Sequence, residues 1–238
     1  AYCGFKSRHE VAYFDLDFVK EEIRRIGMQG FKEVFVVDAN LGGTKERAKR
    51  IMEYFNKYAP DSKLTIYLRP EFIDDEFISI LKDSNLKEIR IGIQTLNDNV
   101  PNWVRSNSLY HIKEELPKLS KNNIPWKVEL IIGLPGDNMV GLKKSIDFVE
   151  ENLKPTEYCC YPLTVIKGTE MYEYYLQGKI NIDKSGMAIS SYSYNNDELL
   201  GMQEYSKLRM NKYLQANYHD LDLDKKIKRN KVMIKSIE

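Results

Sequence analysis

The sequence predicts an α/β fold, and more narrowly a partial parallel (β/α) barrel that is open on one side. Short runs rich in β-branched residues alternate with longer stretches whose apolar residues fall at helical spacing. Successive runs start between 24 and 40 residues apart, which is the length of a βα unit. Five such units without a Gly-x-Gly-x-x-Gly turn favour a barrel over a dinucleotide-binding sheet. The predicted strands cover residues 33–38, 63–68, 87–93, 127–132 and 157–165.

The elements follow in the order of a barrel, except at the start. A helix over residues 17–28 precedes the first predicted strand, so the chain begins one strand late. Ala48, Ile51 and Phe55 fall at helical spacing after that strand, and the later strands have similar partners. The strands are almost continuously apolar, so we expect helices to bury both faces of the sheet.

The βα rhythm stops at about residue 178, which divides the chain into two predicted parts. Residues 1–178 form the partial barrel. Residues 179–238 form a small helical segment that closes the barrel and contributes to the substrate site. This second part has a polar stretch over residues 190–196, a helix to about residue 214 and a tail of mixed charge over residues 220–238. Alternating charges in the tail indicate a solvated end rather than a basic binding arm.

Composition excludes several classes of protein. The chain of 238 residues has 36 Lys and Arg against 35 Asp and Glu, so its net charge of +1 argues against a bulk nucleic-acid binder. The mean hydropathy is −0.50 and no apolar run approaches the length of a membrane span. Three cysteines are too few for a disulfide framework. We therefore expect a cytoplasmic protein that does not enter the membrane.

Candidate functional residues follow the predicted strands, because the chemistry of a parallel barrel lies at the carboxyl ends of its strands. The Gln94 amide can both donate to and accept from sugar hydroxyls, and Arg105 can bind a carboxylate with two hydrogen bonds. Together they suit a ligand with a ribose and a carboxylate, although each residue could also be part of an ordinary turn. The other candidates are Asp38, Asn40, Arg69, Gly133, Val165 and Ile166.

Four motifs in this order resemble the radical S-adenosylmethionine (radical SAM) superfamily. They are Tyr2-Cys3, GIQTLN from Gly92 followed by Arg105, IIGLPGDN from Ile131 and PLTVIKGT from Pro162. The resemblance is strongest to the branch with cobalamin-binding methyltransferases, tRNA methylthiotransferases and coproporphyrinogen dehydrogenase. It implies a 4Fe–4S cluster bound by a Cys-x-x-x-Cys-x-aromatic-Cys loop, and SAM cleaved to a 5′-deoxyadenosyl radical.

The resemblance also implies a role for individual residues. Tyr2 matches the aromatic position of the cluster loop and Cys3 the third cysteine, so the first two cysteines would precede residue 1. We therefore expect this chain to be the C-terminal part of a longer protein. The resemblance implies that Gln94 contacts the ribose of SAM, Arg105 its carboxylate, and Asp38 and Asn40 its amino group. It further implies that backbone groups of Tyr2, Val165 and Ile166 contact adenine and that Gly133 lies beneath the adenosine. Relatives carry an acidic residue at the position of Tyr67, and Arg69 or Glu71 would take its place.

The function implied is cobalamin-dependent C-methylation of an unactivated carbon in a peptide or small natural product. An upstream cobalamin-binding domain and an electron donor such as flavodoxin or ferredoxin would be its partners. One alternative is a cobalamin-independent enzyme that resembles the methylthiotransferases or coproporphyrinogen dehydrogenase. Another is a degenerate barrel that serves as a binding or scaffold module, and a third is a metabolic barrel with a phosphate site at Lys167-Gly168-Thr169.

Overall fold

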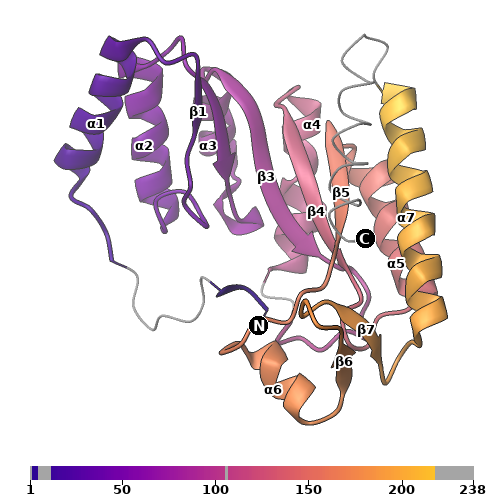
Figure 1. Ribbon diagram of the computed structural model, residues 1–238. Helices are drawn as coiled ribbons and strands as arrows, with labels where there is room; N and C mark the ends of the chain where they lie inside the picture. Colours follow the sequence, from indigo (N-terminus) through magenta and orange to yellow (C-terminus); the bar gives the residue numbers. More distant parts are fainter. Residues whose placement is uncertain (1, 5–11, 105–106, 218–238) are drawn as a thin grey trace.

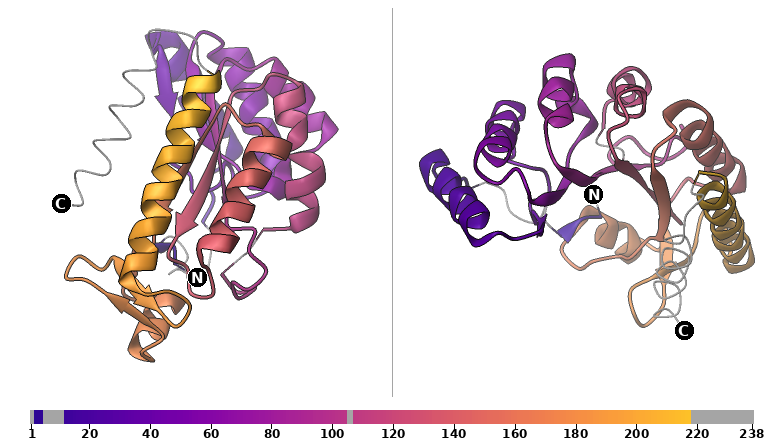
Figure 2. Two further views of the ribbon diagram at one scale, coloured as in Figure 1. Left: turned by 90° about the vertical axis from the view of Figure 1, so that its right-hand side faces the viewer. Right: turned by 90° about the horizontal axis from the view of Figure 1, so that it is seen from above.

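The computed structural model describes residues 2–4, 12–104 and 107–217. Its centre is a parallel sheet of five strands in the order β1-β2-β3-β4-β5. This order confirms the predicted parallel α/β fold, and the sheet curves into an arc that stays open (Figure 2). The strands are β1 (Glu33–Phe35), β2 (Lys63–Tyr67), β3 (Leu86–Gln94), β4 (Trp126–Ile132) and β5 (Glu157–Pro162).

Helices lie along the outer, convex side of this arc, as Figures 1 and 2 show. Their starts are set by side chains that cap free backbone amides: Thr44 accepts from the Arg47 amide, and Asp74 accepts from the Phe77 amide at 2.8 Å. The helices on this side are α1 (Leu16–Gln29), α2 (Lys45–Tyr58), α3 (Asp75–Lys82), α4 (Pro117–Lys121) and α5 (Met139–Phe148), while α6 (Glu170–Leu176) and α7 (Asn196–Asn217) belong to the C-terminal part.

The two faces of the sheet differ, and this corrects the expectation that helices bury both. In β3, Ile89, Ile91 and Ile93 are buried, whereas the residues between them are only partly buried. Burial in β4 alternates in the same way around Glu129 and Ile131. The apolar set faces the helices, and the alternate set faces the concave side of the arc. This concave face is polar because no layer of helices from the described residues lies over it.

Two strands are shorter than predicted. β1 ends at Phe35, three residues before the predicted end, although the Val36 amide still donates to the Thr65 carbonyl. β5 ends at Pro162, because Thr164 pairs instead with Met187 in an isolated antiparallel bridge. Apolar and β-branched composition therefore extends past the point where each strand leaves its neighbour.

Within the described residues, the C-terminal part is not wholly helical. An antiparallel hairpin of β6 (Ile180–Ile182) and β7 (Ala188–Ser191) follows α6. Its turn is fixed by Asp183, whose carboxylate accepts from the Ser185 amide at 2.8 Å. The sequence pattern did not predict this hairpin, because its strands are short and its second strand runs into the polar stretch of residues 190–196. Helix α7 then packs against β5 and α5 beyond the edge of the arc. The division of the chain after residue 178 stays a prediction.

Within the described residues, no helix has both the length and the apolar character that crossing a membrane requires.

Candidate functional site

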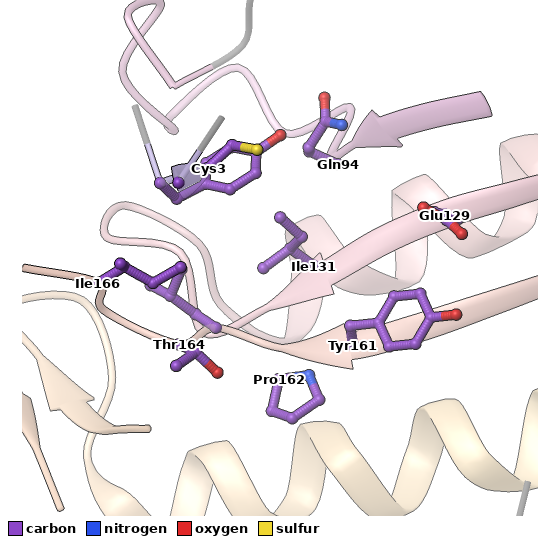
Figure 3. A pocket seen from close by; sticks show the side chains of 11 residues that line it. Cys3, Gln94, Glu129, Ile131, Tyr161, Pro162, Thr164 and Ile166 are labelled. Atoms are coloured by element: carbon purple, nitrogen blue, oxygen red, sulfur yellow. The ribbon is translucent and has the colours of Figure 1, made fainter. Parts of the chain in front are cut away.

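A cavity of about 600 Å³ opens on the concave face, at the carboxyl ends of β3, β4 and β5. Residues 2–4 form its opposite wall, so the first residues of the chain face strands that lie far from them in sequence (Figure 3). Its volume suits a cofactor-sized ligand. The lining residues are Tyr2, Cys3, Gly4, Gln94, Glu129, Ile131, Tyr161, Pro162, Leu163, Thr164 and Ile166.

Cys3 is exposed and lies on this wall of the cavity. A cysteine that packs in the core would be buried, whereas a cluster ligand has to face the cavity. Gly4 follows Cys3, and a side chain at that position would meet only the end of Ile166. The wall therefore leaves space beside the thiol. Among the described residues, no group of three His, Cys, Asp or Glu side chains could hold a metal ion. Cys3 can thus supply one thiolate, and an iron–sulfur cluster requires further cysteines.

Gln94 is directed into the cavity by an irregular strand end. The pairing of β3 with β4 shifts by one residue between Gly92 and Gln94, and Gln94 adopts a left-handed φ of 63°. Such bulges re-aim side chains beside functional sites, and a left-handed non-glycine residue is strained. A Cβ at Gly92 would overlap the Gln94 amide, so this glycine makes room for it. Asn107 donates to Gln94 Oε1 at 3.2 Å and also to the Gly92 carbonyl.

Glu129 lies beside this amide on β4, since its register partner on β3 is Gly92. Burial raises the pKa of the Glu129 carboxyl, while the positive charges of Arg90 and Lys127 act in the opposite direction. The candidates chosen from the sequence did not include Glu129. The signal that could have found it is the alternation of Lys127, Glu129 and Ile131 within an otherwise apolar strand.

Two tyrosines add polar groups to the cavity. Tyr2 lines the cavity together with Gln94, and burial raises the pKa of its phenol. Tyr161 projects from β5 near Glu129 (Figure 3). Burial raises the pKa of Tyr161 too, and Cys159 and Glu129 reinforce the shift.

The remaining wall is apolar. Ile131 and Leu163 lie at the ends of β4 and β5, and Ile166 is 44% exposed on the loop that follows. Figure 3 shows Ile131, Thr164 and Ile166 on the side of the cavity that faces Cys3. This arrangement offers a flat ring an apolar surface next to the polar group formed by Gln94 and Glu129.

Three predicted residues lie outside this cavity, at the ends of β1 and β2. Asp38 accepts from the Gly42 amide at 3.0 Å, and Asn40 accepts from the Arg69 amide at 3.0 Å. The Arg69 guanidinium donates to Glu71 at 3.1 Å. These side chains hold neighbouring loops, and none of them lines the cavity.

Gly133 and Val165 lie close to the cavity, but they too are absent from its lining. The Gly133 carbonyl accepts from the Tyr194 hydroxyl at 2.5 Å, and the Val165 amide donates to the Gly186 carbonyl at 2.8 Å. Arg105, the predicted carboxylate ligand, lies outside the described residues. Of the predicted site residues, the structure brings together Tyr2, Cys3, Gln94 and Ile166.

Comparison with known proteins assigns this arrangement to a family. The model of the radical SAM superfamily matches residues 1–149, more than half of the chain. The chain belongs to the radical SAM superfamily. This radical SAM chain is 23% identical over 214 residues to the heme chaperone HemW of Bacillus subtilis. The match covers 84% of the chain and 55% of HemW, so the chain spans about half the length of this curated relative.

Solved structures agree with the partial barrel. The radical SAM methyltransferase TsrM from Kitasatospora setae, with cobalamin and a [4Fe-4S] cluster bound, superposes with a TM-score of 0.61 at 16% identity. That match covers 71% of this chain and 35% of TsrM. Coproporphyrinogen III oxidase (HemN) from Escherichia coli, a radical SAM enzyme, gives a TM-score of 0.60 at 16% identity over 83% of this chain and 45% of its own. At such identities, the likeness shows the fold alone.

Proposed function

We propose that this chain binds SAM in the cavity between residues 2–4 and the ends of β3, β4 and β5, and that Cys3 is one thiolate ligand of a 4Fe–4S cluster. The observation that carries the proposal is the position of the Cys3 thiol, which faces the same cavity as Gln94 and Glu129. When bound, the cluster and SAM together supply a 5′-deoxyadenosyl radical. The family's other two cysteine ligands would precede residue 1.

The ribose of SAM is assigned to Gln94 and Glu129. A ribose presents two neighbouring hydroxyls, and these two side chains project from adjacent strands toward one space. A carboxylate accepts hydrogen bonds from hydroxyls strongly, while an amide can both accept and donate. Asn107 holds the Gln94 amide before the ligand arrives. Such preorganisation lowers the cost of binding.

The adenine is assigned to the apolar wall around Ile166. Backbone groups of Tyr2, Val165 and Ile166 would hold its polar edge, and Gly133 would let the strand end pass beneath the adenosine. The Val165 amide already donates to Gly186, so its carbonyl is the group proposed to contact adenine. The apolar lining also excludes water from the adenosyl end of the ligand.

The methionine end would extend toward the ends of β1 and β2. Arg105 is proposed to bind its carboxylate. The Asp38 carboxylate, which already accepts a hydrogen bond from the Gly42 amide, would also accept one from the amino group of SAM. Asn40 and Arg69 act there by fixing the loop, because the Asn40 side chain already accepts from the Arg69 backbone.

The reaction proposed is cobalamin-dependent methylation of an unactivated carbon in a peptide or small natural product. It rests on the motif resemblance, and the TsrM structure is consistent with it in fold. A cobalamin-binding domain upstream and a flavodoxin or ferredoxin as electron donor would complete the enzyme. The second candidate is a cobalamin-independent radical SAM enzyme, which the match with HemW over 84% of the chain favours. A scaffold without chemistry would have no need for an exposed thiol in this cavity.

The test is anaerobic reconstitution of the intact protein with iron and sulfide, in the presence and absence of cobalamin, followed by addition of SAM and a one-electron reductant such as dithionite or reduced flavodoxin. We expect an iron–sulfur absorption band, cleavage of added SAM to 5′-deoxyadenosine and, for the first candidate, bound cobalamin. A protein that binds the cluster but no cobalamin would exclude the methylcobalamin step and leave the second candidate. Absence of both the cluster and SAM cleavage would contradict the radical SAM assignment of the site.

A further inference from the structure

Directly after Gln94, the chain enters a buried polar network that makes none of the proposed SAM contacts, although Thr95, Asn97 and Asp137 lie within the GIQTLN and IIGLPGDN motifs. The network joins the loop after β3 to the start of α5. Its four side chains are almost fully buried: Thr95 is 2% exposed, Asn97 5%, Asp137 1% and Ser145 1%. Buried polar groups are costly unless they form hydrogen bonds, so this network defines a single loop geometry.

The central contact joins Asn97 to Asp137. Asn97 Nδ2 donates to Asp137 Oδ1 at 2.8 Å, and the same oxygen accepts from the Asn138 amide at 2.9 Å. On its other side, Asn97 Oδ1 accepts from the Asn99 amide at 3.0 Å. The Asn97 amide group therefore uses its donor toward the β4–α5 loop and its acceptor toward its own loop.

Ser145 of α5 forms a hydrogen bond with the backbone of Leu96, the residue between Thr95 and Asn97. Its Oγ accepts from the Leu96 amide at 2.9 Å, and its own hydroxyl donates to the Gly141 carbonyl at 2.9 Å. Gly141 allows this close packing, because a Cβ there would overlap both the Asn97 amide and the Asp137 carboxylate. Loop and helix are thus in contact with no space for a larger residue.

We propose that the Asn97–Asp137 pair positions Gln94 for SAM by anchoring the three residues that follow it. This inference rests on the proposed function. Gln94 has a left-handed φ of 63°, which costs energy and persists only where the surrounding structure fixes it. Thr95 turns back at once, since its amide donates to the Ile93 carbonyl at 2.7 Å. Beyond that turn, the contacts to Asp137 and Ser145 hold the loop in place.

The direction of the central hydrogen bond gives the proposal a sharp test. Asp137→Asn keeps an oxygen that can accept from Asn97, so this variant should bind SAM almost as the wild type does. Asn97→Asp places two carboxylates together in a buried site, so the pair should separate and Gln94 should lose its position. When both substitutions are combined, the new amide at position 137 can donate to the new carboxylate at position 97. The Asn138 amide, which shares the Asp137 oxygen in the wild type, then loses its acceptor, so the double variant restores the contact between positions 97 and 137 in reverse and restores the network only in part.

The measurements are equilibrium SAM binding, the KM for SAM and the maximal rate of SAM cleavage, all made on the intact cluster-loaded protein. For Asn97→Asp we expect a Kd and a KM raised about tenfold, with kcat changed by less than about twofold, because a bound ligand still reacts. The double variant should regain part of the affinity that Asn97→Asp loses. Ser145→Ala removes the acceptor for Leu96 together with the hydroxyl contacts to Thr95 and Gly141, so it should raise the Kd about threefold and serves if Asn97→Asp does not fold.

Ser62→Ala is the matched control. Ser62 is 2% exposed and donates to the Phe31 carbonyl at 2.6 Å, at the opposite end of the sheet. It should lower the melting temperature without changing SAM affinity. A folded Asn97→Asp protein, or a folded Ser145→Ala protein in its place, with wild-type SAM affinity would overturn the proposal, as would a folded double variant without recovery. A wild-type protein that binds no SAM would instead contradict the proposed function, and this inference with it.

Discussion

The ends of β3, β4 and β5 and the ends of β1 and β2 occupy the same edge of one sheet, yet they present polar side chains in different ways. Gln94 and Glu129 project into a cavity, and Gln94 is held there by other side chains. Asn40 and Asp38, at the other end of the sheet, accept hydrogen bonds from nearby backbone amides. Both groups lie at or near the carboxyl ends of parallel strands, but their side chains point in different directions and have different hydrogen-bond partners.

This difference separates residues that contact a ligand from residues that shape a loop. The family resemblance assigned Gln94, Asp38 and Asn40 alike to SAM, whereas Glu129 was found only in the structure. Of these residues, Gln94 and Glu129 line the cavity, and Asp38 and Asn40 do not. Variants in the two regions should therefore divide into those that change SAM affinity and those that mainly change stability.

The largest effect is expected at Cys3. In Cys3→Ala, the intact protein should lose most of its cluster iron and all detectable SAM cleavage, while the far-UV spectrum stays unchanged. The reason is that the thiolate is a cluster ligand and makes no core contact. Cys160→Ala is the control, since Cys160 packs against the core on β5 and should leave the iron content unchanged. Normal iron and normal cleavage in Cys3→Ala would remove Cys3 from the site.

The next effect is expected at the ribose pair. Glu129→Ala should weaken SAM binding about tenfold or more, because hydrogen bonds to a charged group contribute about 1.5–3 kcal/mol. Gln94→Ala should weaken it about fivefold, as expected for a neutral hydrogen bond. Isothermal titration of the cluster-loaded protein measures both. Equal affinity in both variants and the wild type would mean that the ribose binds elsewhere.

A smaller effect should appear as a pH dependence. Burial raises the pKa of Glu129, with Arg90 and Lys127 opposing and Glu88 reinforcing the shift, and the phenol of Tyr2 also lies near this carboxyl. The folded protein therefore holds this proton more tightly than the unfolded chain does. The stability from this group is present below the unfolded pKa and is lost as pH rises through the folded pKa.

SAM affinity should change in the opposite direction over the same pH window, because the ionised carboxylate is the stronger acceptor for ribose hydroxyls. Affinity is thus expected to fall on acidification at a pH above the ordinary glutamate pKa of about 4.3. Titrations of SAM at several pH values, with Glu129→Gln as the control, measure this. A pH profile that survives unchanged in Glu129→Gln would assign the proton to another group.

The smallest effect on SAM is expected at Asn40. Asn40→Ala removes the acceptor for the Arg69 amide, so it should lower the free energy of unfolding by about 1 kcal/mol. SAM affinity should change by less than about threefold, since the side chain does not line the cavity. Chemical denaturation and SAM titration of the same variant decide between the two regions. A loss of SAM affinity larger than that in Gln94→Ala would mean that the two regions do not differ in how they contribute to SAM binding.

The sequence was sufficient to predict the five strands of the parallel sheet and to place Gln94 at the end of one of them, because both predictions follow from local patterns. Strand composition and βα spacing do not depend on distant contacts, and an amide directly after a strand is visible in the chain itself. The family motifs added Cys3, and the structure places it on the cavity wall.

Glu129 and Asn107 could not be found in this way. Glu129 lies within a strand that was interpreted as apolar on both faces, and its role depends on which face stays uncovered. Asn107 acts only through the return of its loop to Gly92 and Gln94. The hairpin of β6 and β7 was missed because both strands are short and mix apolar with polar residues. In each case the missing information is tertiary, namely which surfaces meet.

The most direct test of the proposed site is an anaerobic crystal structure of the intact, cluster-loaded protein with SAM. We expect the cluster on the thiolate of Cys3, and the ribose hydroxyls within hydrogen-bond distance of Gln94 and Glu129. The adenine should lie against Ile166. SAM bound outside this cavity, or a ribose that contacts neither Gln94 nor Glu129, would contradict the account.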